Sequence, residues 1–292
     1  MDDAINPATA KRFDRRRFLK MLGATAVTGL GLYGYATRIE PHWVSLVRRP
    51  LPITGLPQNW LGKTLLQISD LHVGKVVDTG YLIRTLEEAK ALAPDLVVVT
   101  GDFTHGADAH DTQLLTRVLD HLPRGSRATL AILGNHDYGD SFADRSAADG
   151  VARVLETEAV TLLRYSAVDL DGLEVVGFDD AWSPNWDPDA AARLLELPAP
   201  RIVLCHNPDV CDMGVWGPHP SYTLSGHTHG GQCRPPFLPP PFLPVLNRRY
   251  TQGEFILDAK RRLYINPGLG YLMSARFNVR PELTLFTLTE AS

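Results

Sequence analysis

The sequence predicts an α/β fold in which two mixed β-sheets are flanked by helices, an arrangement that fits a four-layer α/β/β/α sandwich. The first half of the chain alternates short apolar runs with amphipathic stretches, the pattern of β-α repeats with right-handed crossovers and partly parallel sheet. The second half adds hairpin signals, which bring antiparallel pairs into the sheets. The chain has 292 residues, 44% of them hydrophobic, and its charges are well mixed, so its composition is that of a folded protein.

Three β-α repeats come first among the predicted elements. Each strand is a short run rich in Val, Ile and Leu, and each helix carries apolar residues at helical spacing. Strand 65–69 is followed by helix 79–92, strand 96–100 by helix 111–121, and strand 128–133 by helix 146–157.

The remaining elements are hairpins, single strands and one helix. Strands 166–170 and 173–177 meet at Asp171-Gly172, a dipeptide typical of tight hairpin turns. Helix 187–196 and strands 201–205 and 221–225 follow. A second hairpin joins 253–257 to 262–266, and an alternating strand at 283–288 comes last.

The first 40 residues have the features of an export leader, which leaves 41–292 as the folded domain. The stretch Asp14–Lys20 reads Asp-Arg-Arg-Arg-Phe-Leu-Lys and resembles the twin-arginine export signal. The apolar stretch 21–36 that follows is short for a spanning helix, which needs about 20 apolar residues. We therefore expect recognition by the twin-arginine export machinery, which moves folded proteins, and a final location in the periplasm or on the outer face of the cytoplasmic membrane. An uncleaved membrane anchor and a surface amphipathic arm remain alternatives, with Gly34-Tyr35-Ala36 as a candidate cleavage site.

Composition excludes two further classes. The net charge is −4, without the basic surplus typical of nucleic-acid-binding proteins, so no nucleic-acid partner is expected. The three cysteines are too few and too unevenly spaced for a disulfide framework, although a Cys205–Cys211 bridge stays open as an alternative.

Metal-binding side chains gather directly after predicted strands. Asp70 and His72 follow strand 65–69, Asp102 follows strand 96–100, and Asn135, His136 and Asp137 follow strand 128–133. The motif Gly-His-Thr-His adds His227 and His229, and His206 stands alone before it. Open α/β sheets usually place their sites at the carboxyl ends of strands, so these side chains are expected to converge.

The ligand types indicate two divalent metal ions. Imidazole suits zinc, iron and manganese, and the carboxylate and amide oxygens favour manganese or iron over copper. Seven ligands are too many for one catalytic ion with an open position, but they suit two ions that share a carboxylate. We expect two divalent metal ions per chain, manganese, iron or zinc, with manganese favoured.

These motifs, in this order, resemble the calcineurin-like metallophosphoesterase superfamily over about residues 65–231. The longer Gly-His-Thr-His-Gly-Gly-Gln and the late Asn266-Pro267-Gly268 are similar to a branch of exported bacterial phosphodiesterases that includes UDP-2,3-diacylglucosamine hydrolases. The resemblance implies the four-layer sandwich and a metallophosphoesterase domain over 41–292. The chain departs from the family pattern after Gly101-Asp102: many relatives carry an acidic residue a few positions on, whereas this chain continues Phe103-Thr104-His105, which leaves open what surrounds Asp102.

The resemblance also implies a role for each site residue. The first metal would be held by Asp70, His72 and His229, the second by Asn135, His206 and His227, and Asp102 would bridge them. His136 would face the substrate and protonate the leaving oxygen, while Asp137 would keep His136 charged and oriented. A hydroxide between the two metals would be the nucleophile.

Ordinary structural roles compete with these assignments. An Asp in a Thr-Gly-Asp turn commonly hydrogen-bonds its own backbone, and a lone histidine such as His206 is commonly a buried hydrogen-bonding residue. Joint occurrence in the right order favours the site. His105 is ambiguous between substrate contact and loop surface.

The segment 234–244 is rich in proline and cannot be a helix or a central strand. It directly follows the last motif, so it is expected beside the mouth of the site. Its apolar residues would form a lip for a lipid-bearing substrate or contact the membrane surface through 235–244. The alternative is a rigid connector that folds back on the domain.

The favoured function is a binuclear metal-dependent phosphodiesterase or pyrophosphatase that acts outside the cytoplasm on a phosphate ester, with a lipid-linked envelope compound as the expected substrate class. A broad-specificity phosphomonoesterase would use the same metals and the same acid. A non-catalytic metal-binding scaffold is the third alternative, and the retention of Asn135 and His136 argues against it.

Overall fold

The computed structural model describes residues 15–291 and contains two six-stranded sheets that pack face to face. The first sheet has the order β1-β12-β2-β3-β4-β5, with bounds Ser45–Ile53, Glu282–Glu290, Thr64–Ile68, Leu96–Thr100, Ala128–Ile132 and Thr161–Leu162. The second has the order β10-β11-β9-β8-β7-β6, with bounds Gly253–Ile256, Arg261–Ile265, Ser221–Ser225, Arg201–Leu204, Leu173–Gly177 and Ser166–Leu170. Both sheets are mixed, because each combines parallel pairs with at least one antiparallel pair.

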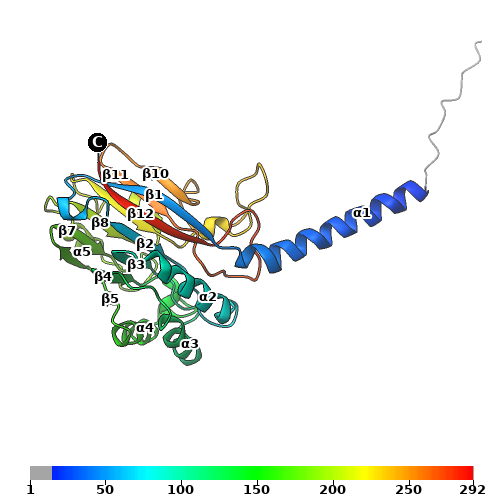
Figure 1. Cartoon of the computed structure of the whole chain (residues 1–292), viewed down its shortest axis with the longest axis horizontal. Coiled ribbons are helices and arrows are strands. Elements are labelled where there is room, and N and C mark those ends of the chain that lie inside the picture. The colour runs from blue at the N-terminus through cyan, green and yellow to red at the C-terminus, as the bar shows by residue number, and fades with distance from the viewer. Residues whose placement is uncertain (1–14, 292) are drawn as a thin grey trace, which may run out of the picture.

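Helices cover the outer faces of the two sheets (Figure 1). Their bounds are α2 Thr79–Ala89, α3 Ala109–Leu119, α4 Arg145–Thr157 and α5 Pro188–Leu194. In β3, Leu96 and Val98 point into the core between the sheets, while the alternate residues Val97 and Val99 pack with residues of α2, α3 and α4. This alternation confirms the predicted arrangement of two mixed sheets flanked by helices.

The predicted strands and helices are all present, with ends that shift by a few residues. The sequence did not predict β1, because Arg48-Arg49-Pro50 and Pro52 break the apolar pattern of a strand. The strand forms at the edge of its sheet, where it pairs in parallel with β12 along one side only. Proline is tolerated at such an edge, since the lost N–H can face away from the ladder.

The amino-terminal segment continues from a helix into the domain. Helix α1 (Arg15–Gly34) carries no buried residue and projects away from the sheets (Figure 1). The next turns, Tyr35–His42, pack on the domain, where Glu40 is buried and the Tyr35 ring lies edge-on to Phe277. Residues 35–40 of the predicted leader therefore contact the domain. Asp14 of the expected export signal lies outside the described residues, and α1 and the other described helices fall short of the apolar length that a bilayer crossing requires.

The three cysteines are free thiols, so the Cys205–Cys211 bridge is not formed. Cys205 and Cys211 are buried and belong to separate apolar clusters.

Candidate metal centre

The strands that precede the candidate ligands end at the same edge of the sandwich. In the first sheet β2, β3 and β4 are parallel neighbours, and in the second sheet β8 and β9 are parallel neighbours. The side chains that follow them therefore converge. Five of these residues have a left-handed backbone, with φ of 52° at Asp70, 47° at His72, 54° at Asp102, 72° at His227 and 49° at His229. Such conformations cost about 1–3 kcal/mol each and persist where the surrounding structure imposes them, most often at functional sites.

The first group of side chains that could hold a metal ion consists of Asp70, His72, Asp102 and His229, all of them buried. The His72 Nε2 atom lies 3.0 Å from His229 Nε2 and 3.4 Å from Asp102 Oδ2. His229 Nε2 is also 3.3 Å from Asp70 Oδ1. Two imidazole nitrogens and two carboxylates thus surround one point, which is a donor set that divalent metals accept.

The second group consists of Asp102, His206 and His227. His206 Nε2 lies 3.2 Å from Asp102 Oδ2, while the other ring nitrogen of His206 bonds to Thr100 O at 2.7 Å. In His227 the Nε2 atom bonds to Pro244 O at 2.7 Å, which leaves Nδ1 for a ligand. Outer hydrogen bonds of this kind fix the tautomer of a metal-binding histidine.

Asn135 completes the set of predicted ligands. It is buried, and its Oδ1 atom has no hydrogen-bond partner, as is also true of His206 Nε2. Buried polar atoms are normally satisfied, so these two atoms fit a ligand at this place. Asp102 belongs to both groups, which is the geometry expected of a residue shared by two ions.

Glycines allow the loops to approach the carboxylates. A Cβ atom at Gly134 would lie 2.2 Å from Asp102 Oδ1, and one at Gly226 would lie 2.3 Å from Asp70 Oδ2. Only glycine fits at these two positions.

The electrostatics of the groups favour a bound cation. Burial raises the pKa of Asp70 to about 6 and lowers the pKa of His227 to about 3. Burial also opposes ionisation of Asp102, but the charges of His206 and His136 outweigh it and hold the pKa of Asp102 well below its usual range. A divalent cation would stabilise the carboxylates in their charged form, use the neutral imidazoles as ligands and displace the proton that Asp102 favours on His206, so the residues present fit such an ion.

Comparison with known proteins decides the family. The family model described as calcineurin-like phosphoesterase matches residues 63–231, which is more than half of the chain. This chain belongs to the calcineurin-like phosphoesterase family. As a member, it is a metal-dependent phosphoester hydrolase.

Curated relatives match over nearly the whole chain. The uncharacterized metallophosphoesterase YkuE of Bacillus subtilis is 32% identical over 95% of this chain and 98% of its own length. The phosphodiesterase YaeI of Escherichia coli is also 32% identical, over 94% of this chain and 98% of its own. The UDP-2,3-diacylglucosamine pyrophosphatase LpxG of Chlamydia muridarum is 25% identical, over 86% of this chain and 91% of its own.

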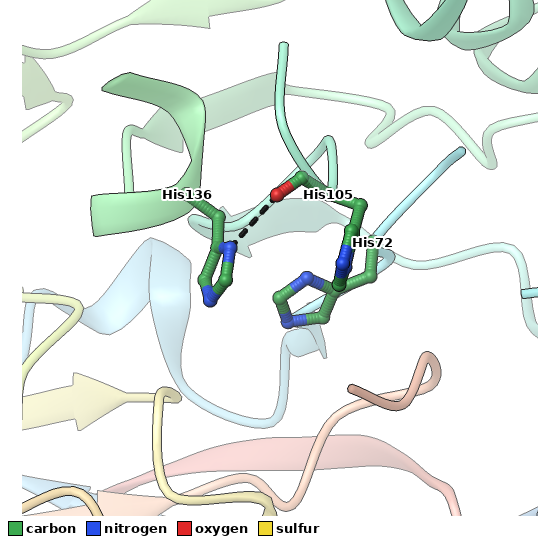
Figure 2. A group of neighbouring side chains, drawn as sticks. All are labelled: His72, His105 and His136. Carbon is green, nitrogen blue, oxygen red and sulfur yellow. Dashed lines mark hydrogen bonds between the residues drawn. The ribbon is translucent and has the colours of Figure 1, made fainter. Parts of the chain in front are cut away.

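In this phosphoesterase, His136 lies beside both ligand groups. Its backbone N–H donates to Asp102 Oδ1 at 2.9 Å, and its ring Nδ1 is 2.8 Å from the backbone oxygen of His105. Figure 2 shows this hydrogen bond and the rings of His72, His105 and His136 close together. The bond requires a proton on Nδ1, so that Nε2 of His136 is the nitrogen left to face a substrate.

Asp137 differs from its expected role. Its Oδ1 accepts hydrogen bonds from Thr104, its Oδ2 accepts one from the Gly134 backbone, and burial raises its pKa to about 7. Among the hydrogen bonds of the described residues, the ring of His136 is oriented by the His105 carbonyl, whereas Asp137 holds the two ligand loops together.

Sequence reasoning missed three of the residues that shape the mouth of the site, Phe142, Trp182 and Leu272. A cavity of about 460 Å³ opens over the ligands, and its lining is mostly apolar. Besides site residues it is lined by His105, Phe142, Trp182, Phe242, Pro244 and Leu272. The sequence indicated the position of the segment 234–244, because this segment directly follows the last motif. His105, which the sequence left between substrate contact and loop surface, lines the cavity.

Proposed function

We propose that this chain hydrolyses a phosphodiester or pyrophosphate bond with two divalent metal ions. The observation that carries the proposal is that two buried ligand groups share Asp102. Asp70, His72 and His229 would hold the first ion, Asn135, His206 and His227 the second, and Asp102 both. Manganese is favoured, because the set mixes imidazole with carboxylate and amide oxygens.

The proposed metal ions and the side chains of the site would have different roles in the reaction. When bound, the two ions would supply a nucleophilic oxygen at neutral pH and stabilise charge on the phosphate. His136, with Nε2 facing the cavity, would protonate the leaving oxygen. The carbonyl of His105 would keep that nitrogen aimed at the substrate.

The shape of the mouth supports a substrate with an apolar group. Phe142, Trp182 and Leu272 line the cavity over the ligands, and a second, almost wholly apolar cavity of about 240 Å³ adjoins it across Phe242. Apolar pockets with a few polar groups are typical of sites that bind small organic ligands. A lipid-linked phosphate ester would place its phosphate at the ligands and its chain in these cavities. The relatives named as a phosphodiesterase and as a pyrophosphatase agree with this class.

The activity itself is tested by metal removal. Chelator-stripped protein is expected to be inactive, and added manganese is expected to restore hydrolysis of bis(p-nitrophenyl) phosphate above that of p-nitrophenyl phosphate. The measurement is release of p-nitrophenolate at increasing manganese, with bound metal counted per chain. A preference for the monoester would favour the phosphomonoesterase. Metal-loaded protein that cleaves neither ester nor a lipid-linked pyrophosphate would favour the scaffold.

We also propose that the protein is exported by the twin-arginine pathway and works at the outer face of the cytoplasmic membrane. The basic start of α1 and the apolar segment after it support export. The segment 235–244 supports membrane contact, because Phe237, Leu238 and Phe242 expose most of their surface to solvent while Leu243 folds back into the domain. The location would be tested by fractionation of cells with and without a working twin-arginine pathway.

The lip has its own prediction. The double change Phe237→Ser and Leu238→Ser is expected to lower turnover of a phospholipid-like diester in vesicles by about thirtyfold, because two apolar side chains that each stabilise membrane contact by about 1 kcal/mol would be lost. Hydrolysis of soluble bis(p-nitrophenyl) phosphate should stay within about twofold, since neither residue lines the cavity over the ligands. Ile256→Ser, on the edge strand β10, is the exposed apolar control. Equal losses on both substrates would contradict the lip.

A further inference from the structure

Arg276 is a fully buried cation next to the first ligand group. The two N–H groups of its Nη2 atom are surrounded by three carbonyl acceptors, Pro267 O at 2.8 Å, Gly268 O at 3.1 Å and the carbonyl of Gly270. The same Nη2 lies 3.4 Å from His229 Nδ1, on the side of the ring that faces away from the other ligands. A buried arginine is rare unless it is paired. Here Nη2 contacts one loop and one candidate ligand, Nη1 donates to Val279 O at 3.4 Å, and Nε has no hydrogen-bond partner.

The loop that Arg276 holds supports Asp70. The backbone N–H of Gly270 donates to Asp70 O at 2.7 Å, and the N–H of Leu269 donates to Ser69 O at 3.0 Å. A Cβ atom at Gly268 would lie 2.6 Å from the Cβ of Asp70, so the loop packs directly on this residue. Asp70 has a left-handed backbone, and a strained residue keeps its place only where neighbours impose it.

The amino-terminal segment holds Arg276 in turn. The backbone N–H of Arg276 donates to Ala36 O at 2.8 Å, and Glu40 Oε1 accepts the backbone N–H of Val279 at 2.6 Å. Glu40 is buried and is one of the charges that favour the charged form of Arg276. A continuous set of contacts therefore leads from the turns after α1 to the first ligand group.

We propose that Arg276 is a positioning residue for the first metal ion, acting through Asp70 and His229, and that Glu40 keeps Arg276 in place. Among the hydrogen bonds of the described residues, none joins Arg276 to Asn135, His206 or His227. The link to the second group is indirect, through Asp70, which accepts the backbone N–H of His227, so the first ion should depend on Arg276 far more than the second. The inference rests on the two-metal function proposed above. Arginine is required at this position because the lysine side chain is shorter and would leave its ammonium short of the place that Nη2 occupies among these acceptors.

Manganese binding to the full chain tests this inference without any assay of activity. Metal-stripped Arg276→Lys is prepared in two backgrounds, His206→Ala, which keeps the first site, and His72→Ala, which keeps the second. Calorimetric titration is expected to show manganese affinity about 10- to 100-fold weaker in the first background and much less affected in the second, as for other residues that orient metal ligands. Arg280→Lys is the matched control, because Arg280 also donates to main-chain carbonyls, those of Trp43 and Val44, away from the site.

A second variant and a check on the parent protein complete the test. If circular dichroism shows that Arg276→Lys is unfolded, Glu40→Gln in the same two backgrounds decides, with a weaker first site as the supporting result. Equal weakening of both sites, or no weakening of either, would overturn the role of Arg276. A parent protein that binds no manganese would instead overturn the two-metal function on which the inference rests.

Discussion

Replacing Asp102 by Asn is expected to lower kcat/KM for bis(p-nitrophenyl) phosphate by about a thousandfold or more. Asp102 is common to both groups of candidate ligands, so its loss would remove one ligand from each of the two proposed ions. Metals contribute several kcal/mol of charge stabilisation to such reactions, and each 1.4 kcal/mol corresponds to about tenfold in rate. Asn keeps the size of the side chain and one oxygen that can still accept the backbone N–H of His136. The substitution therefore removes the negative charge of the side chain and leaves its size nearly unchanged.

The measurement for Asp102→Asn combines hydrolysis with bound manganese per chain. The control is Asp95→Asn, a carboxylate at the opposite end of the same strand β3, where Asp95 accepts the backbone N–H of Thr64. This control should keep both activity and metal. An Asp102→Asn protein that binds two manganese ions and retains a tenth or more of the activity would show that Asp102 is not shared.

The ligand positions could be predicted because their signals are local. Asp70, Asp102 and Asn135 each follow a short apolar strand, and the carboxyl ends of neighbouring parallel strands meet at one edge. The convergence of the first sheet with β8 and β9 followed from the same rule. The order of the strands within each sheet did not, because it depends on pairing between segments far apart in the chain.

The partners of these ligands could not be predicted, because they are tertiary contacts without a sequence pattern. Arg276 is 47 residues from His229, and nothing in the residues around it indicates that its side chain is buried. The main-chain oxygens of His105 and Pro244 orient His136 and His227, and a backbone carbonyl leaves no signature in residue type. The edge strand β1 was missed for a different reason, since its prolines and arginines resemble a linker.

Replacing His136 by Ala is expected to lower turnover of a glycerophosphodiester by about 10²–10⁴-fold, which is the usual contribution of a general acid. Both proposed metal ions should stay bound. His136 is absent from the two groups that share Asp102, and its ring is fixed by the carbonyl of His105 rather than by a ligand. The loss should therefore fall on kcat, with bound manganese per chain unchanged. His110→Ala, an exposed histidine on α3, is the control and should change neither quantity.

Two substrates with different leaving groups distinguish whether His136 donates a proton or only shapes the site. The p-nitrophenolate anion leaves without a proton, whereas the alkoxide of a glycerophosphodiester is far more basic and needs one. We expect His136→Ala to cost at least about tenfold more on the glycerophosphodiester than on bis(p-nitrophenyl) phosphate, because only the alkoxide depends on proton transfer. Equal losses on the two diesters would mean that His136 stabilises the phosphate charge alone. In that case protonation of the leaving oxygen would have to come from another group at the mouth, and His105, whose ring stacks on that of His136 at 5.5 Å, would be the next residue to replace.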